Sequence, residues 1–212
     1  MSLEEYYPVS CPFCAISVAY PPSSNSPIPL SPDPEKVFPQ CHLILSTPHV
    51  LAFLDILPIA PGHILLTTRD HYRKLSDLYA ASTHSQEESK RESAQESSRA
   101  LGEYLPLVSA ALVRATGIED WNVVQNNGER AAQVVPHVHF HLIPRYQEGR
   151  REGKGNVDVG MLKSWRMFGR GAREDLDDEE GVEMARCLRE ALRVELGEEG
   201  SEGGGGEGGS KL

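Results

Sequence analysis

Three histidines occupy alternate positions in the segment VVPHVHFHLIPR, residues 134–145, of a chain that has eight histidines in all. They are His137, His139 and His141. Successive side chains of a strand point to opposite faces, so the three imidazoles would share one face and the apolar residues between them the other. A solvent face on an edge strand has no reason to prefer imidazole over lysine, threonine or glutamate. The spacing therefore predicts a strand whose imidazole face lines a pocket or meets a partner.

The segment before these histidines, QNNGERAAQVVP, carries neutral hydrogen-bonding groups. They are Asn126, Asn127, Gly128 and Gln133. Imidazole can act as a metal ligand, as a proton carrier near neutral pH or as a nucleophile. A glycine-containing loop can bring its backbone close to a phosphate. Histidines that follow such a loop therefore favour a role for imidazole in chemistry on a phosphate-bearing ligand.

A second candidate site is the pair Cys11 and Cys14 in CPFC. Such a pair can be a redox dithiol, half of a zinc site or two buried thiols. Redox use would favour a helix start within a βαβ pattern, which the surrounding residues do not suggest. Zinc would need about two further ligands. Four cysteines without a secretion signal are typical of reduced thiols in an intracellular compartment.

The elements that must position these residues can be traced by periodicity. Short apolar runs between turn signals predict three strands within residues 41–69, and two more at 121–128 and 137–145. Helical spacing predicts a short helix near Tyr72–Tyr79, a main amphipathic helix at Leu101–Leu112 and a helix from about 178 to 196. The order indicates an α+β domain with one antiparallel sheet of about five strands, on which the two internal helices pack.

Composition excludes some classes of function. The net charge of −10 disfavours a general nucleic-acid binder, whereas one local pocket can still bind a small anion. The apolar runs are far shorter than the roughly 20 residues of a membrane helix, so a soluble protein without a membrane partner is expected.

The final residues Ser210, Lys211 and Leu212 match the peroxisomal import tripeptide and follow a Gly-rich run that would act as a tether.

Two blocks, NNGERAAQVVPHVHFHLIPR and LAFLDILPIAPGHILLTTRDH, together resemble the histidine-triad (HIT) superfamily, in its zinc-containing nucleotide hydrolase branch. The resemblance covers residues 50–72 and 121–146 closely. It implies a HIT-like fold and attack by His139 on the α-phosphate of a purine nucleotide, with a covalent nucleotidyl-histidine intermediate that water hydrolyses. His141 and Gln133 would stabilise the phosphate oxygens, Asp55 would bind the ribose, and Asn126 and Gly128 would complete the nucleotide site.

The same resemblance implies a structural Zn²⁺ site. Its ligands would be Cys11, Cys14, His71 and His137. The alternative is two thiols that bind no metal. His63 is expected either beside the base or ribose pocket or as a hydrogen-bonded core histidine.

Two positions depart from the pattern of many relatives, which have glycine before the glutamine and serine after it. This chain has Ala132 and Val134 there, and the loss of the hydroxyl leaves the identity of the leaving group open. The implied substrates are nucleotide phosphoramidates and dinucleoside polyphosphates. The alternative is a catalytically weak, nucleotide-binding regulatory protein of the same family. A DNA-repair deadenylase is disfavoured because neither a basic surface nor a nucleic-acid-binding zinc module is visible.

The relatives also imply a homodimer that joins two sheets. The chain then divides into five segments: a zinc-knuckle segment at 1–20, a Pro/Ser-rich insert at 21–40, the HIT core at 41–146, an extension with a helix at 147–196, and a disordered Gly/Glu tail at 197–212. The HIT core contains a polar insert at 82–99. The tail ends in SKL, which would engage the peroxisomal import receptor.

Overall fold

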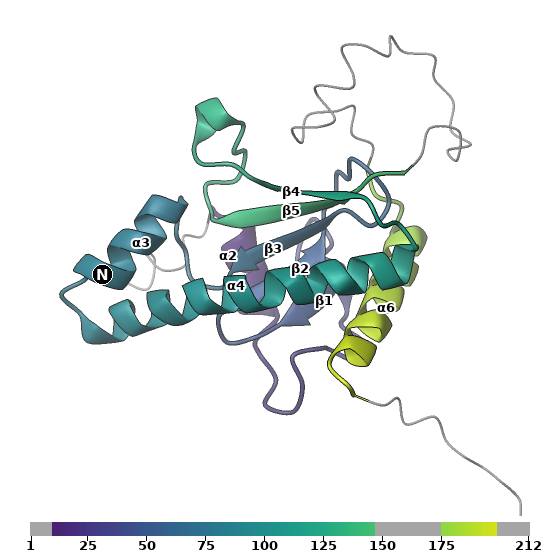
Figure 1. Ribbon diagram of the computed structural model, residues 1–212, viewed down its shortest axis with the longest axis horizontal. Helices are drawn as coiled ribbons and strands as arrows, with labels where there is room; N and C mark the ends of the chain where they lie inside the picture. Colours follow the sequence, from purple (N-terminus) through teal and green to yellow (C-terminus); the bar gives the residue numbers. More distant parts are fainter. Residues whose placement is uncertain (1–9, 147–174, 199–212) are drawn as a thin grey trace, which may run out of the picture.

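The computed structural model describes residues 10–146 and 175–198 (Figure 1). Within these residues, five strands form one antiparallel sheet with the order β1-β2-β3-β5-β4. The strands are β1 (Leu43–Ser46), β2 (Val50–Leu54), β3 (Ile64–Thr68), β4 (Trp121–Gln125) and β5 (His139–Pro144). The α+β fold and the five-stranded antiparallel sheet expected from the sequence are confirmed.

Strands β1, β2 and β3 are buried on both faces, which explains why their sequences are continuous apolar runs. Strands β2 and β3 are joined by a short connection, and β5, which follows β4 in the chain, lies between β3 and β4 in the sheet. The register places Phe53 opposite Leu65 and Leu65 opposite His141. Directly opposed residues share a face, so one row of side chains runs from β2 through β3 to β5.

Three helices lie on one side of the sheet: α4 (Glu88–Thr116) and α6 (Asp178–Glu195) pack on the strands, and α3 (Leu75–His84) packs against α4. Helix α4 runs across the sheet, and α6 crosses α4 near the C-terminal end of α4 (Figure 1). The side chains of Val108 and Leu112 on α4 and of Leu188 on α6 are fully buried against the strands. Gly117 ends α4 in the left-handed conformation and donates its N–H to Val113, a common helix C-terminus.

The opposite face of the sheet is covered by the short helix α2 (Pro12–Ala19) and by the chain that follows it, including the turn η1 (Pro34–Lys36). Phe13 and Ile16 of α2 pack with Phe53 and Leu65. Helix α2 is not among the elements expected from the sequence. A signal was available, because proline is favoured in the first turn of a helix and Pro12 follows Cys11, which is the N-cap residue.

The sequence marks residues 82–99 as a polar insert in the HIT core. In the structure, α3 ends at His84 and most of the insert forms the first turns of α4. Ala94 and Ser97 are buried in this part of α4. Small residues make a narrow packing face, and this face lacks the large apolar side chains by which periodicity is recognised.

Part of the expected C-terminal extension, including its helix, is described as α6. The remaining calls for residues 1–9, 147–174 and the tail from 199 to 212, with its SKL terminus, lie outside the described residues. Among the helices of residues 10–146 and 175–198, none is both long and apolar enough to span a bilayer.

Candidate active site and metal centre

A cavity of about 610 Å³ lies on the α2 side of the sheet. Its floor includes Phe53 of β2, Asp55 directly after β2, and both His139 and His141 of β5. Its walls are mostly apolar and come from three segments: α2, residues 37–41 and residues 132–135. A cavity of this size suits a small molecule such as a nucleotide. The alternation of β5 explains its lining, because His139 and His141 point to this face while Phe140 packs toward α4.

The His139 ring is held in one tautomer by the backbone. Its Nδ1 lies 2.6 Å from the carbonyl oxygen of His137. A carbonyl only accepts hydrogen bonds, so Nδ1 must carry the proton and donate it. The unprotonated Nε2 is then available as a nucleophile. The edge of this ring also contacts Phe13 of α2, at 5.1 Å between ring centroids, which fixes its orientation.

Behind His141 lies a second, fully buried histidine, His63. The Nε2 of His63 is 3.0 Å from Nδ1 of His141, and the N–H of Ile59 donates to Nδ1 of His63 at 3.2 Å. In a neutral pair, His63 therefore donates from Nε2, and His141 keeps its own proton on Nε2. His141 can then donate a hydrogen bond to a bound group.

The Asp55 carboxylate sits beside these two rings. Its Oδ2 is 3.4 Å from Nδ1 of His63 and 3.9 Å from Nδ1 of His141. The carboxylate would stabilise an added proton on either ring, because an opposite charge at this range favours the charged form. Asp55 also accepts from the N–H of Leu57, which orients it at the cavity wall.

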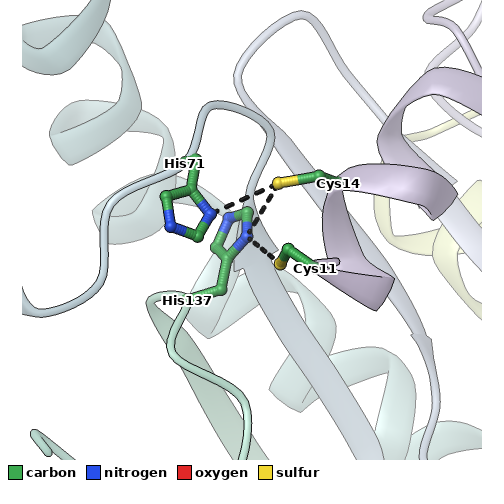
Figure 2. Close-up of side chains that lie close together, drawn as sticks. All are labelled: Cys11, Cys14, His71 and His137. Atoms are coloured by element: carbon green, nitrogen blue, oxygen red, sulfur yellow. Dashed lines mark hydrogen bonds between the residues drawn. The ribbon is translucent and has the colours of Figure 1, made fainter. Parts of the chain in front are cut away.

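Four side chains converge at the junction of α2 with β3 and β5 (Figure 2). They are Cys11, Cys14, His71 and His137. Cys11 Sγ lies 3.4 Å from Nδ1 of His137, and Cys14 Sγ lies 3.3 Å and 3.6 Å from Nδ1 of His71 and His137. Tetrahedral zinc with ordinary bond lengths separates a sulfur and a nitrogen ligand by about 3.6 Å. The spacing therefore fits a Cys2His2 zinc centre.

The orientation of His137 also fits a metal ligand. Its Nε2 donates to the carbonyl of Thr68 at 2.9 Å, which leaves the lone pair of Nδ1 directed at the two thiols. A hydrogen bond with Cys14 lowers the pKa of the Cys11 thiol far below its usual range, and contacts with His137 and His71 act in the same direction. The same hydrogen bond raises the pKa of Cys14. One of the two sulfurs is thus readily available as a thiolate, the form that binds metal.

Two expectations about these residues need correction. Strand β5 begins at His139, so His137 lies in the bend before it and is oriented by Thr68 and the thiols rather than by strand alternation. The CPFC pair does stand at a helix start, contrary to the expectation. This helix packs on an antiparallel sheet, however, and is not the crossover of a βαβ unit.

The loop residues that were expected to bind nucleotide lie beside the cavity and are not among the residues that line it. Gln133 turns its amide inward, accepting from the N–H of Gly128 and donating to the carbonyls of Arg73 and His137. Gly128 needs its positive φ of 96° to make this turn. The residues that line the cavity include Asp55, His139 and His141 among those expected; Asn126, Gly128 and Gln133 lie in the adjoining loop.

Some contributors to the site have no clear signal in the sequence. Phe13 and Ile16 form one wall, and Val37 and Phe38 belong to a segment expected to be a surface insert. The environment of His63 was left open and is now defined, since it contacts His141 from within the core. The sequence did carry a signal for the position of His63. His63 is two and four residues from Leu65 and Thr67, and this spacing puts all three side chains on the cavity face of β3 and of the turn before it.

Comparison with known proteins decides the family. The model of the HIT domain matches residues 39–148, more than half of the chain. The chain belongs to the HIT family. Among its HIT relatives is a protein named adenosine 5′-monophosphoramidase from Schizosaccharomyces pombe, 36% identical over 54% of this chain and 72% of that protein. Another, from Arabidopsis thaliana, is named adenylylsulfatase and is 35% identical over 67% of this chain and 58% of its own length.

Solved structures of HIT proteins have the same fold. A zinc-bound histidine triad family protein from Mycobacterium smegmatis superposes with a TM-score of 0.54 at 22% identity, over 90% of this chain and 98% of that chain.

Proposed function

We propose that this HIT protein hydrolyses nucleoside 5′-monophosphates that carry a substituent on the α-phosphate. The observation that carries the proposal is the hydrogen bond from Nδ1 of His139 to the carbonyl of His137, which places the lone pair of this cavity-lining ring on Nε2. His141 and Asp55 lie in the same cavity and supply a hydrogen-bond donor and a carboxylate. Phosphoramidates and dinucleoside polyphosphates of purine nucleosides are the proposed substrates.

The proposed reaction has two displacements at phosphorus. Nε2 of His139 attacks the α-phosphorus, the bond to the substituent breaks, and the leaving group departs with the bonding electron pair. The product is a nucleotidyl-imidazolium whose Nδ1–H still donates to His137. Water then attacks the same phosphorus, loses a proton to solvent, and releases the nucleoside monophosphate and neutral His139.

The other residues have separate tasks. The Nε2–H of His141 donates to a non-bridging phosphate oxygen as negative charge develops there. The carboxylate of Asp55 accepts from the ribose hydroxyls and so orients the phosphate toward His139. Two named activities among the relatives, that of an adenosine 5′-monophosphoramidase and that of an adenylylsulfatase, support this class of reaction.

Zinc is proposed as a structural ion. Cys11, Cys14, His71 and His137 would hold it, and when bound it would supply a rigid link rather than a catalytic group. Since His137 also provides the carbonyl that orients His139, this link would position the nucleophile. We further propose a homodimer and peroxisomal import through the terminal SKL. Removal of the tripeptide would then leave a fluorescent fusion in the cytosol.

The test is a substrate panel with full-length wild type and the His139→Asn variant. Adenosine phosphoramidate, diadenosine triphosphate and diadenosine tetraphosphate are compared by release of AMP. His139→Asn should lose at least about 10³-fold in kcat, because the nucleophile is gone, yet still bind AMP. His84→Asn, at an exposed histidine that ends α3, is the matched control. Full activity in His139→Asn would refute the mechanism, and AMP binding without turnover in wild type would favour a regulatory protein.

A further inference from the structure

The cavity spans the sheet from β5 to the residues that precede β1. His139 and His141 of β5 lie at one end, and Cys41, two residues before β1, lies at the other. Strands β3 and β2 stand between these ends, which are therefore three strand spacings, or roughly 14 Å, apart. Asp55, directly after β2, lies between them in the strand order. If the phosphorus binds at His139 and the ribose at Asp55, as the proposed function requires, the base is directed toward the β1 end.

Residues 37–41 form the cavity wall at the β1 end, and hydrogen bonds hold this segment in place. The N–H of Cys41 donates to the carbonyl of Pro34 at 3.0 Å. The hydroxyl of Tyr20, at the end of α2, donates to the carbonyl of Asp33 at 2.7 Å. The turn η1 is thus tied both to α2 and to the residue before β1, and the end of the Pro/Ser-rich insert is a built wall of the site.

Among residues 37–41, Gln40 is the one whose side chain carries an amide. Its Nε2 lies 3.4 Å from Oδ2 of Asp178, the first residue of α6. A carboxylate only accepts hydrogen bonds, so this atom is the amide nitrogen and it donates. Asp178 is not among the residues that line the cavity, so the amide nitrogen is used outside it. The orientation therefore leaves the amide oxygen of Gln40, a hydrogen-bond acceptor, for a bound base.

An acceptor at the base end favours a base with an exocyclic amine. Adenine carries an amine at position 6, whereas guanine and hypoxanthine carry a carbonyl oxygen there. The amide oxygen of Gln40 accepts from the amine, but it meets the carbonyl with no proton between the two oxygens. We propose that Gln40, oriented by Asp178, is the specificity-determining residue that selects adenine over 6-oxopurines. The proposal rests on the proposed function and specifies its substrate class as adenine nucleotides.

The test measures the dissociation constants of AMP and of inosine monophosphate (IMP) by calorimetry on the full-length, zinc-loaded protein. Wild type should bind AMP about tenfold more tightly than IMP, the effect of one hydrogen bond. Gln40→Met keeps the length of the side chain and removes its amide. It should bind AMP about tenfold more weakly than wild type but IMP at least as tightly. Gln86→Met, at an exposed glutamine between α3 and α4, is the control and should keep the wild-type ratio.

Asp178→Ala tests how the amide is oriented. Without the carboxylate, the amide of Gln40 can turn and offer the base either its N–H or its oxygen. This variant should bind IMP more tightly than wild type, so the preference for AMP should fall to about twofold although no residue that lines the cavity has changed. An unchanged preference would show that Asp178 does not orient the amide.

The outcomes separate base selection from hydrolysis. Equal affinity of wild type for AMP and IMP, or an unchanged ratio in Gln40→Met, overturns this inference and leaves the proposed function intact. If Gln40→Met loses the preference for AMP but wild type hydrolyses no substrate of the panel, this inference is supported and the proposed hydrolase is contradicted. A wild type that binds neither nucleotide contradicts both.

Discussion

At the scale of the residue, backbone carbonyls decide which nitrogen of His137 and of His139 carries the proton and which carries the lone pair. His137 and His139 each donate to a carbonyl, but from opposite nitrogens: Nε2 in His137 and Nδ1 in His139. His137 therefore presents Nδ1 to the thiols, and His139 presents Nε2 to the cavity. Two neighbouring histidines of one motif thus acquire different chemistry, ligand and nucleophile, from local hydrogen bonding alone.

His63 provides a residue-scale prediction because it acts through His141 and does not line the cavity. Replacing His63 with leucine removes the donor to Nδ1 of His141, so the proton of His141 can move to that nitrogen. We expect kcat/KM to fall about 10- to 100-fold, the effect of one or two hydrogen bonds. Steady-state kinetics should locate the loss mainly in kcat.

The matched variant is His63→Gln, whose amide N–H can replace Nε2–H. It should recover a substantial part of the activity that His63→Leu loses. Equal loss in both variants, with unchanged thermal stability, would show that donation to His141 is unimportant.

At the scale of the element, the contact between α6 and β1 depends on a glycine. A Cβ built at Gly181 would lie 2.5 Å from Nε2 of the buried His42 ring. Gly181→Ala should therefore lower the free energy of unfolding by about 1–3 kcal/mol, the typical cost of overpacking. Gly102→Ala on α4 is the control, because open space surrounds it, and it should raise stability by up to about 1 kcal/mol. Urea unfolding distinguishes them; stabilisation by both substitutions would contradict the packing.

Helix α2 is joined to the sheet by the four metal-ligand candidates, so zinc should stabilise this junction. Wild type should contain one zinc per chain by elemental analysis. Cys11→Ser should lose the metal and lower Tm by at least about 5 °C, because metal binding is coupled to folding. Cys187→Ser, on α6, should retain both properties. A wild type that is free of zinc and as stable as Cys11→Ser would eliminate the site.

Comparing the predicted with the observed elements shows which parts of the structure can be predicted from the sequence. The strands and α6 follow from apolar runs and helical spacing, and the resemblance to the HIT superfamily implied the grouping of Cys11, Cys14, His71 and His137. The missed features have physical causes: the first turns of α4 bury small residues such as Ala94, and helix α2 is only eight residues long. The inward turn of Gln133 depends on tertiary packing, which spacing along the chain does not encode; for His63, spacing indicates the face of the sheet but not the contact with His141.

At the scale of the whole molecule, β4 is an edge strand of the sheet formed by the described residues, and it has exposed apolar side chains. Trp121 and Val123 are 37% and 43% exposed on the face that α4 covers. An unpaired edge of this kind invites pairing with a second copy. In the proposed dimer, Val123→Lys should shift the mass measured by light scattering from dimer toward monomer. Val182→Lys, at an equally exposed valine on α6, should remain dimeric. A monomeric wild type would contradict this arrangement.

The central claim is that His139 forms a covalent bond to phosphorus. The most direct measurement mixes full-length protein with a nucleotide substrate, quenches the reaction in alkali, where phosphoramidates persist, and maps the adduct by mass spectrometry. The account predicts a nucleoside monophosphate on the peptide that contains His139, and none in His139→Asn. An adduct at another residue, or turnover by wild type with no adduct at His139 under conditions that trap the intermediate, would contradict it.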